Sequence, residues 1–157
     1  MYLINRMTKL WGPPTWFLFH TLAEKIREDK FDDMKIDIIN MIKRICRNLP
    51  CPDCSNHSTQ MLSQLNINMI KTKDDLKQFL CHFHNSVNTK TRKPVFKSEE
   101  LNNRYKLANT NNIVQYFVQT WSKKSHNPKL MTEELHKSLA VNHFIDWWKI
   151  NYIHFHQ

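Results

Sequence analysis

The stretch Leu49-Pro50-Cys51-Pro52-Asp53-Cys54 places two cysteines three positions apart, directly ahead of a segment with helical spacing. In that segment, Ser55 to Leu65, apolar side chains at positions 61, 62 and 65 recur with the period of a helix. Cys51 is therefore expected at the helix cap and Pro52 at the first helical position, where a missing N–H costs nothing. Unpaired backbone donors and the positive end of the helix dipole would lie beside Cys51 and favour its thiolate.

A thiolate beside a second thiol can form, exchange or break a disulfide, so redox chemistry is the leading hypothesis. A C-x-x-C pair alone is about as typical of a metal-ligand pair or a buried structural bridge. A zinc module would combine Cys51 and Cys54 with Cys81 and with His82 or His84, and ligand chemistry permits that set. The two pairs are further apart than in the usual zinc finger, and the tryptophans near the N-terminus would have no role.

The composition indicates one domain, with or without an appendage, and excludes the common nucleotide-binding loops. The chain has 157 residues, enough to bury a sizeable core. Its one glycine is Gly12, whereas a Rossmann fingerprint needs three glycines and a P-loop needs two. Any nucleotide must then be held by side chains and helix ends. With so few turn-formers and no clear run of alternating apolar residues, the predicted fold class is all-α.

The charge balance is basic but dispersed. Twenty-three Lys and Arg against 14 Asp and Glu give a formal charge of +9. No window concentrates this charge into a long run, which favours a solvated basic face over a nucleic-acid site. No sustained apolar stretch precedes Trp11, so we expect no signal peptide, and no window is long enough to cross a bilayer. Four cysteines without an export signal favour catalytic or metal-binding thiols over a disulfide scaffold.

Apolar periodicity predicts seven helical segments after a short lead-in and a turn at Trp11–Pro14. The expected segments, in chain order, run from the prolines to about 29, from 32 to 47, from the cysteine pair to 65, from 73 to 89, from 98 through 105, from 109 to about 121 and from 132 to the low 150s. A linker at 122–129 separates the last two.

Two helices carry polar side chains that need partners. Trp16 and His20 are four apart and share one face, although core packing explains such a pair as well. Cys81, His84 and Asn88 share a stripe on the fourth helix, and a polar ligand would satisfy this histidine and asparagine. A capped and solvated helix end is the alternative for Asn88. The remaining cysteine, at position 46, is expected to be a buried free thiol.

Four motifs occur in a fixed order along the chain. They are Trp11-Gly12-Pro13-Pro14-Thr15-Trp16, then His20, then Cys51-Pro52-Asp53-Cys54, then His84-Asn85-Ser86-Val87-Asn88. In order and spacing they resemble the Erv/ALR family of FAD-linked sulfhydryl oxidases, over roughly residues 8–106. The resemblance implies a four-helix bundle that binds FAD, with a short fifth helix, commonly as a homodimer. It also implies the reaction, in which protein dithiols become disulfides and O2 becomes hydrogen peroxide.

The resemblance also implies roles for individual residues. A substrate thiolate would attack Cys51, expected to be the more exposed sulfur, and Cys54 would lie against the isoalloxazine ring. Gly12 would let the backbone approach the cofactor. The residues expected to bind FAD are Gly12, Trp16, His20, Cys54, His57, His84, Asn85, Asn88, Lys93, Arg104 and Tyr105.

The sequence departs from the family pattern in three places. Ser98 stands where many members have a cysteine that pairs with the one at Cys81, so Cys81 is expected to be unpaired. No shuttle pair is visible, so the protein would act on a dithiol protein directly or through a separate thiol carrier. We therefore expect an oxidase domain at 1–108 and a helical extension at 109–157. The extension's aromatic residues would either close the core of the same domain or bind a partner.

The compact form without a shuttle pair, together with an Asn-, Ile- and Lys-rich composition, resembles the virus-encoded members of the family. Such a protein would work in the host cytoplasm or in the virion.

Overall fold

The computed structural model describes residues 2–124, 128 and 131–157, with side chains described from residue 10 onward in those ranges. The described residues form α-helices and short 3-10 turns with no strand, which confirms the all-α prediction. The helices are α1 (Tyr2–Lys25), α2 (Phe31–Arg47), α3 (Pro52–Ser63), α4 (Lys73–Lys90), α5 (Ser98–Lys106), α6 (Thr110–Ser122) and α7 (Met131–Asn151). The 3-10 turns are η1 (Glu28–Lys30), η2 (Ile67–Met69) and η4 (Tyr152–His154).

The first helix differs from the prediction at both ends. The expected turn at 11–14 is wrong, because α1 begins at Tyr2 and contains Pro13 and Pro14 in its interior. Proline keeps a helical φ but lacks the N–H and crowds the carbonyl four residues earlier, so the helix continues with two backbone hydrogen bonds fewer. The hydroxyl of Thr15 donates to the Trp11 carbonyl at 2.6 Å within this stretch. The helix ends at Lys25, earlier than expected, because Arg27 takes an extended conformation ahead of η1.

The helices near the site have the ends that the sequence predicts. Asp32 and Asp33 lie in the first turn of α2, where carboxylates complement the helix dipole. At the start of α4, the Thr72 hydroxyl accepts from the Asp75 N–H, and the Asp75 carboxylate accepts from the Thr72 N–H. These caps fix the start of α4, whose far end carries part of the candidate site.

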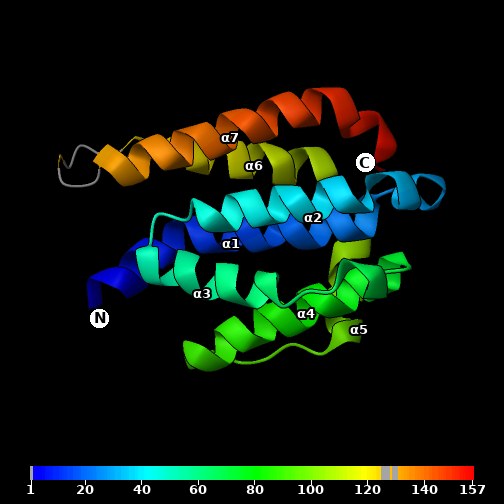
Figure 1. The fold of residues 1–157 in the computed structure, drawn as a ribbon, viewed down its shortest axis with the longest axis horizontal. Helices are drawn as coiled ribbons and strands as arrows, with labels where there is room; N and C mark the ends of the chain where they lie inside the picture. The colour runs from blue at the N-terminus through cyan, green and yellow to red at the C-terminus, as the bar shows by residue number, and fades with distance from the viewer. Residues whose placement is uncertain (1, 125–127, 129–130) are drawn as a thin grey trace.

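Figure 1 shows the helices in layers, with α1 and α2 between α6 and α7 on one side and α3, α4 and α5 on the other. Leu22 of α1, Ile38 of α2 and Leu80 of α4 are completely buried, and they belong to one continuous core. Phe117 of α6 and Phe144 of α7 belong to the same core. Helices α6 and α7 therefore pack in this core, as expected if the extension closes the core of the same domain.

Specific hydrogen bonds tie the C-terminal layer to α1. The indole Nε1 of Trp121 donates to the Thr15 hydroxyl at 3.0 Å, and both side chains are buried. The Lys25 ammonium donates to the carbonyl oxygens of Lys106 and Gln157 at 3.1 and 3.3 Å. Together these contacts hold both ends of the C-terminal layer against the first helix.

None of the helices within the described ranges is both long enough and apolar enough to span a bilayer.

Candidate active site

The cysteine pair lies at the beginning of α3, as the sequence predicts. Cys51 is the N-cap residue, with an extended backbone, and Pro52 is the first helical residue. The Cys54 N–H donates to the Cys51 sulfur at 3.3 Å, and the two residues form a disulfide with their Cα atoms 5.2 Å apart. A disulfide at a helix N-terminus releases a thiolate that the helix dipole stabilises when an incoming thiolate opens it.

Of the two cysteines, Cys51 is the more buried residue as a whole, although the resemblance implies that its sulfur is the more exposed. Residue Cys51 is only 8% exposed, whereas Cys54 is half-buried. The reason lies in the cap, because the Cys51 side chain folds back over the first turn to accept the Cys54 N–H. The sequence locates a cap residue but does not show how far its side chain is covered.

One hydrogen bond holds the start of α3 against the end of α2, and a second one lies within α3. The Ser55 hydroxyl donates to the Arg47 carbonyl at 2.9 Å, and the Ser58 hydroxyl donates to the Cys54 carbonyl at 2.6 Å. Cys46 lies in the same contact region as a buried free thiol, as expected. Burial raises the pKa of Cys46 to about 12, and the neighbouring Ser58 hydroxyl offsets only part of this effect. At neutral pH, Cys46 is therefore a packed, unreactive thiol.

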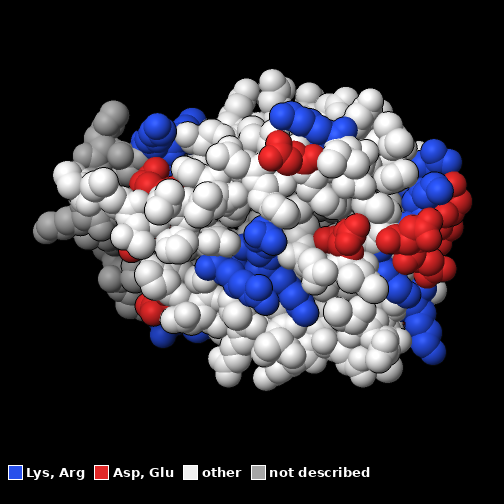
Figure 2. All heavy atoms as spheres, turned by 45° about the horizontal axis from the view of Figure 1, so that its top comes forward, with Lys and Arg blue, Asp and Glu red and all other residues white. Residues whose placement is uncertain are grey.

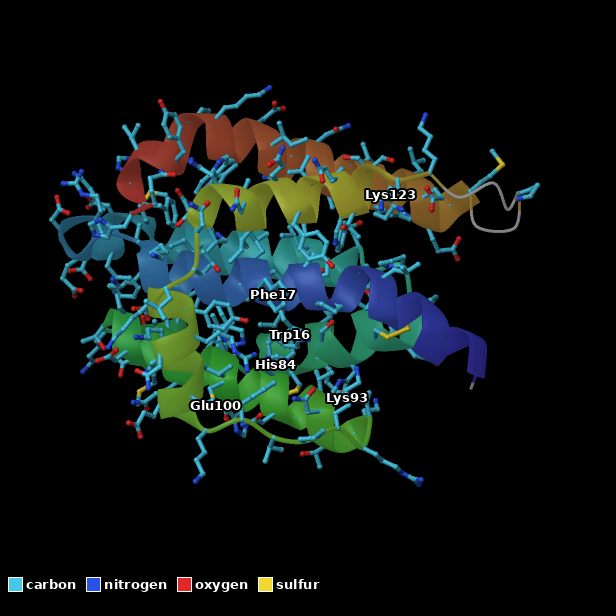
Figure 3. All side chains as sticks on the ribbon, turned by 180° about the vertical axis from the view of Figure 1, so that it is seen from behind. Trp16, Phe17, His84, Lys93, Glu100 and Lys123 are labelled. Carbon is cyan, nitrogen blue, oxygen red and sulfur yellow. A yellow bond between two sulfur atoms is a disulfide. The ribbon has the colours of Figure 1, made fainter. Side chains whose placement is uncertain are left out.

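Four predicted site residues from three helices form one aromatic cluster. The rings of Trp16 and His84 stack face to face, with centroids 4.0 Å apart and planes 7° apart. His20 Nε2 lies 2.9 Å from His84 Nδ1, and the Tyr105 ring stacks on His20 at 5.0 Å. Figure 3 shows Trp16 and His84 facing each other between α1 and α4. The helical spacing that pairs Trp16 with His20 thus builds one wall of a site that α4 and α5 complete.

The segment that follows α4 is fastened to it by two asparagines. Both ends of the Asn85 amide bond the backbone of Phe96, with the two distances at 2.8 Å. Asn88 is 5% exposed and donates to the Pro94 carbonyl at 2.9 Å. Asn85 and Asn88, both predicted to touch the cofactor, therefore position the 94–96 backbone over the cluster. The sequence pattern does not predict Phe96 as part of this site. Its ring lies 5.1 Å from the ring of His84.

Burial keeps the two cluster histidines neutral. Burial, followed by the charges of His84 and Arg104, lowers the pKa of His20 to about 3. Burial and the nearby charges of Lys93 and Arg104 lower the pKa of His84 to about 4. Burial raises the pKa of Tyr105 to about 12, against the opposing effect of Arg104. At neutral pH the cluster is thus uncharged and bordered by two cations, Lys93 and Arg104.

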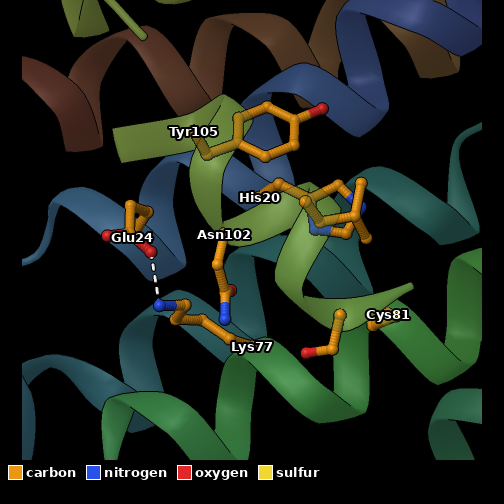
Figure 4. Close-up of a pocket in the computed structure, with 8 residues that line it drawn as sticks. His20, Glu24, Lys77, Cys81, Asn102 and Tyr105 are labelled. Carbon is orange, nitrogen blue, oxygen red and sulfur yellow. Dashed lines mark ion pairs between the residues drawn. The ribbon is translucent and has the colours of Figure 1, made fainter. Parts of the chain in front are cut away.

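A small cavity of about 10 Å³ lies beside the cluster, between α1, α4 and α5 (Figure 4). His20 and Tyr105 form one side of it and Cys81 another. Lys77 and Glu24 form an ion pair there with both side chains largely buried, and nothing in the sequence pattern predicted that pair. Cys81 is a free thiol, as expected, and its pKa is raised by burial.

Two further predicted residues lie outside the aromatic contacts described above. At Gly12, an added Cβ would meet no atom within 4 Å, so the packing of the protein itself does not require a glycine there. His57 is half-buried on α3, and burial together with the charge of Lys90 lowers its pKa.

Of the proposed zinc ligands, Cys51 and Cys54 are joined in the disulfide. Within the described part of the chain, no three His, Cys, Asp or Glu side chains form a group that could hold a metal ion.

The family is decided by a comparison of the chain with known protein families. The model of the Erv1 / Alr family matches residues 13–106. The chain belongs to this family. The matched segment contains both cysteines and every predicted cofactor residue except Gly12, which lies one position before it. The Erv1/Alr match ends at the last residue of α5, so α6 and α7 lie outside it.

Curated relatives of the chain share this segment. The chain is 32% identical over 94 residues to the FAD-linked sulfhydryl oxidase ERV1 of Arabidopsis thaliana, covering 60% of this chain and 49% of the relative. It is 30% identical over 94 residues to the rice protein of the same name, covering 60% of this chain and 48% of the relative. A protein of Invertebrate iridescent virus 3, named as a candidate FAD-linked sulfhydryl oxidase, is 26% identical over 100 residues, covering 63% of this chain and 68% of the relative. The chain thus spans about half the length of the two plant relatives. No solved structure matches the chain.

The histidine pair predicts how stability depends on pH. Because His20 and His84 titrate far below 6.5 in the folded protein, the unfolded chain binds more protons as the pH falls below that value. The stabilisation is therefore complete above about pH 6.5 and is lost as the pH falls toward 4. Between pH 7 and 5, we expect the free energy of unfolding to fall by about 2 kcal/mol for each histidine.

Chemical denaturation at pH 7, 6 and 5 measures this effect. The variant His20→Gln keeps a hydrogen-bonding side chain beside His84 but loses one titrating group, so its dependence on pH should be about half as steep. An equally steep dependence in wild type and variant would contradict the assignment.

Proposed function

We propose that the chain is an FAD-dependent sulfhydryl oxidase, which oxidises protein dithiols to disulfides and passes the electrons to O2 to give hydrogen peroxide. The observation that carries the proposal is the Cys51–Cys54 disulfide at the start of α3. The disulfide and the aromatic cluster both lie in residues 13–106, the segment that the Erv1/Alr family model matches. The names of the plant and viral relatives, FAD-linked sulfhydryl oxidases, support the same activity.

The chemistry of the cluster fits FAD. Trp16 and His84 stack on each other and Tyr105 stacks on His20, and the same flat faces could stack against an aromatic ring system. The neutral imidazoles of His20 and His84 can each donate or accept a hydrogen bond. Lys93 and Arg104 supply positive charge for a diphosphate, and the 94–96 backbone is fixed beside them. When bound, the flavin would supply the transfer of the two electrons from the reduced cysteines to O2, which protein side chains cannot perform.

The chain's own residues would carry out the thiol exchange. A substrate thiolate attacks one sulfur of the Cys51–Cys54 bond, that bond breaks, and the other sulfur leaves as a thiolate. A second substrate thiolate then attacks the mixed disulfide, so the substrate leaves oxidised and both cysteines are reduced. We propose the order that the resemblance implies, with attack on Cys51 and with Cys54 facing the cofactor. Positions 12, 57, 85 and 88 belong to this proposal as lining residues.

The partners of the reaction are a dithiol protein, or a separate thiol carrier, and O2. Cys46 and Cys81 are both buried free thiols, so neither offers an accessible second pair that could carry electrons to Cys51–Cys54. We therefore propose that the substrate thiol reaches this disulfide directly. We assign the chemistry to residues 1–108 and propose that residues 109–157 stabilise α1.

The function has a direct test. Purified protein, reconstituted with FAD if necessary, is expected to show the visible absorption of a bound flavin. Supplied with dithiothreitol, it should consume O2 and release one hydrogen peroxide for each dithiol oxidised. Colourless protein that does not take up FAD would contradict the proposal, and zinc found in such a preparation would favour the metal alternative.

We also propose a homodimer that uses the outer face of α7. Met131, Leu135 and Leu139 recur every fourth residue on this helix and are 71%, 59% and 58% exposed. Such an exposed apolar stripe is typical of an interaction surface.

Light scattering tests the dimer. Wild type should give twice the chain mass of 19.0 kDa. The double variant Leu135→Glu, Leu139→Glu should give the mass of one chain, because two charges would have to be buried. Ile36→Glu, at a half-exposed site on α2, is the matched control and should stay dimeric. A single-chain mass for the wild type would contradict the dimer.

Finally, we propose that the chain is virus-encoded and acts in the host cytoplasm or the virion. The support is the pair of invertebrate iridescent virus relatives, of which this chain covers 68% and 83%. Immunodetection in fractionated infected cells and in purified particles tests this location. Recovery in the secretory compartment alone would contradict it.

A further inference from the structure

The disulfide lies at one particular end of the bundle. Figure 1 and Figure 3, which view the molecule from opposite sides, both show the start of α3 at the same end as the ends of α2 and α4. The Ser55–Arg47 hydrogen bond ties the end of α2 to the first turn of α3. The charge of Lys90, the last residue of α4, acts on His57, which lies three residues after Cys54. The three helix ends therefore share one surface around the disulfide.

This surface is positively charged. Arg47, Lys90 and Arg92, two residues past the end of α4, are all exposed, and none of the ion pairs found among the described residues includes any of them. Asp53, between the cysteines, is the carboxylate on the same turn and leaves a formal charge of +2 from these four residues. The dipoles at the C-termini of α2 and α4 and at the N-terminus of α3 together add about −0.5 elementary charge. The remaining charge is still about +1.5, so the helix dipoles do not neutralise the surface.

Four of the five carboxylates of α2 and α4 lie at the opposite end. Asp32 and Asp33 open α2 and Asp74 and Asp75 open α4, one helix length away from the surface around the disulfide. For α2, fifteen residues at about 1.5 Å each separate the first aspartate from Arg47 by roughly 22 Å. Figure 2 shows most acidic side chains of the visible face gathered at the end that carries η1 and the start of α2. At physiological salt that distance exceeds the screening length of about 8 Å, so these carboxylates do not neutralise the disulfide end.

We propose that the surface formed by Arg47, Lys90 and Arg92 binds acidic polypeptide, and that the preferred substrate is a dithiol segment with Asp or Glu beside its cysteines. The inference deepens the proposed function and rests on it, since the substrate thiol must reach Cys51–Cys54. Carboxylates on the segment would pair with the three cations and raise the rate of encounter. The attacking thiolate is itself an anion and gains from the same charges.

A single-turnover experiment tests the preference without flavin or oxygen. Two peptides with one cysteine each, flanked by glutamates or by lysines, are mixed with the protein in its disulfide form. Each thiolate forms a disulfide with one protein cysteine, the Cys51–Cys54 bond breaks, and the released thiolate takes a proton from water. Alkylation and mass measurement at successive times give the rate of this step. Each rate is divided by that of the same peptide with hydroxyethyl disulfide, a neutral reagent, to remove differences in thiol acidity.

At low salt, we expect the normalised rate of the glutamate peptide to exceed that of the lysine peptide by about tenfold or more. Raising the ionic strength from about 0.02 to about 0.5 M shortens the screening length several-fold and should bring the two rates together. The double variant Arg47→Glu, Lys90→Glu should remove or invert the preference. The control Lys30→Glu, Lys149→Glu makes the same change of charge at the far end and should keep it.

Equal normalised rates in the wild type, or a preference for the lysine peptide, would overturn the proposal. An unchanged preference in the Arg47→Glu, Lys90→Glu variant would also overturn it. If that variant does not fold, the wild-type ratio and its salt dependence still decide. Oxidation of dithiothreitol, which is uncharged, is measured in parallel. Its failure would reject the oxidase function, whereas normal dithiothreitol turnover without peptide discrimination would reject only the acidic-substrate inference.

Discussion

Replacing Cys54 with serine is expected to reduce O2 consumption with dithiothreitol by about 1000-fold or more, because a serine hydroxyl cannot form or pass on a disulfide. The change is nearly isosteric and the Cys51–Cys54 loop is short, so the fold should persist. Flavin absorption should also remain, because the stacked cluster of Trp16, His20 and His84 is untouched. Oxygen electrode traces and the visible spectrum of the same preparation measure both properties.

The control for this variant is Cys81→Ser. Cys81 is a free thiol outside the α3 pair, and serine can replace it as acceptor for the Asn85 amide. Its turnover should stay within a few-fold of wild type. The two single-serine variants test the order of attack with hydroxyethyl disulfide as the oxidant. The remaining thiolate attacks this reagent, whose S–S bond breaks and releases mercaptoethanol, and Cys51 in Cys54→Ser should react faster than Cys54 in Cys51→Ser. Undiminished turnover in Cys54→Ser, or slower exchange at Cys51 than at Cys54, would contradict the roles assigned here.

Removing the Trp121 side chain is expected to lower the free energy of unfolding by about 3–5 kcal/mol. Trp121 is completely buried between the C-terminal layer and α1, and its indole N–H bonds Thr15. Trp121→Ala would leave a large cavity in the common core and break that link. Chemical denaturation monitored by circular dichroism measures the loss.

Tyr116→Ala is the matched control on the same helix. Tyr116 is 42% exposed, so its loss should lower the free energy of unfolding by less than about 1 kcal/mol. A soluble, active protein truncated after Lys106 would contradict the argument for Trp121, because that truncation removes both α6 and α7. Similar losses for Trp121→Ala and Tyr116→Ala would contradict it too.

The sequence predicts most of the helical architecture because the determinants are local. Pro52 after Cys51 marks the start of α3, and Pro50 follows the end of α2, as the structure confirms. The tandem prolines of α1 are the exception. Proline usually marks a helix opening, but the packing of α1 in the centre of the molecule outweighs the hydrogen bonds that the prolines remove.

The candidate site is less predictable because its contacts join distant segments. Helical spacing identifies the polar stripe of α4 but not that His84 meets His20, 64 positions earlier. Phe96 shows no pattern of its own, because its place depends on both ends of the Asn85 amide. The covering of Cys51 likewise depends on the side chain turning back onto its own helix, which residue type and spacing do not specify.

The bond between Lys25 and Gln157 has a consequence for biosynthesis. The N–H of Arg27 donates to the His154 carbonyl, and the N–H of His156 donates to the Lys25 carbonyl, so the end of the first helix is completed by residues that are translated long after it. Contacts so far apart in the chain form late and slowly. While ribosomes are still making α6 and α7, the apolar surface of α1 around Leu18 and Leu22 stays uncovered, and we expect a nascent chain stalled at that stage to bind chaperones.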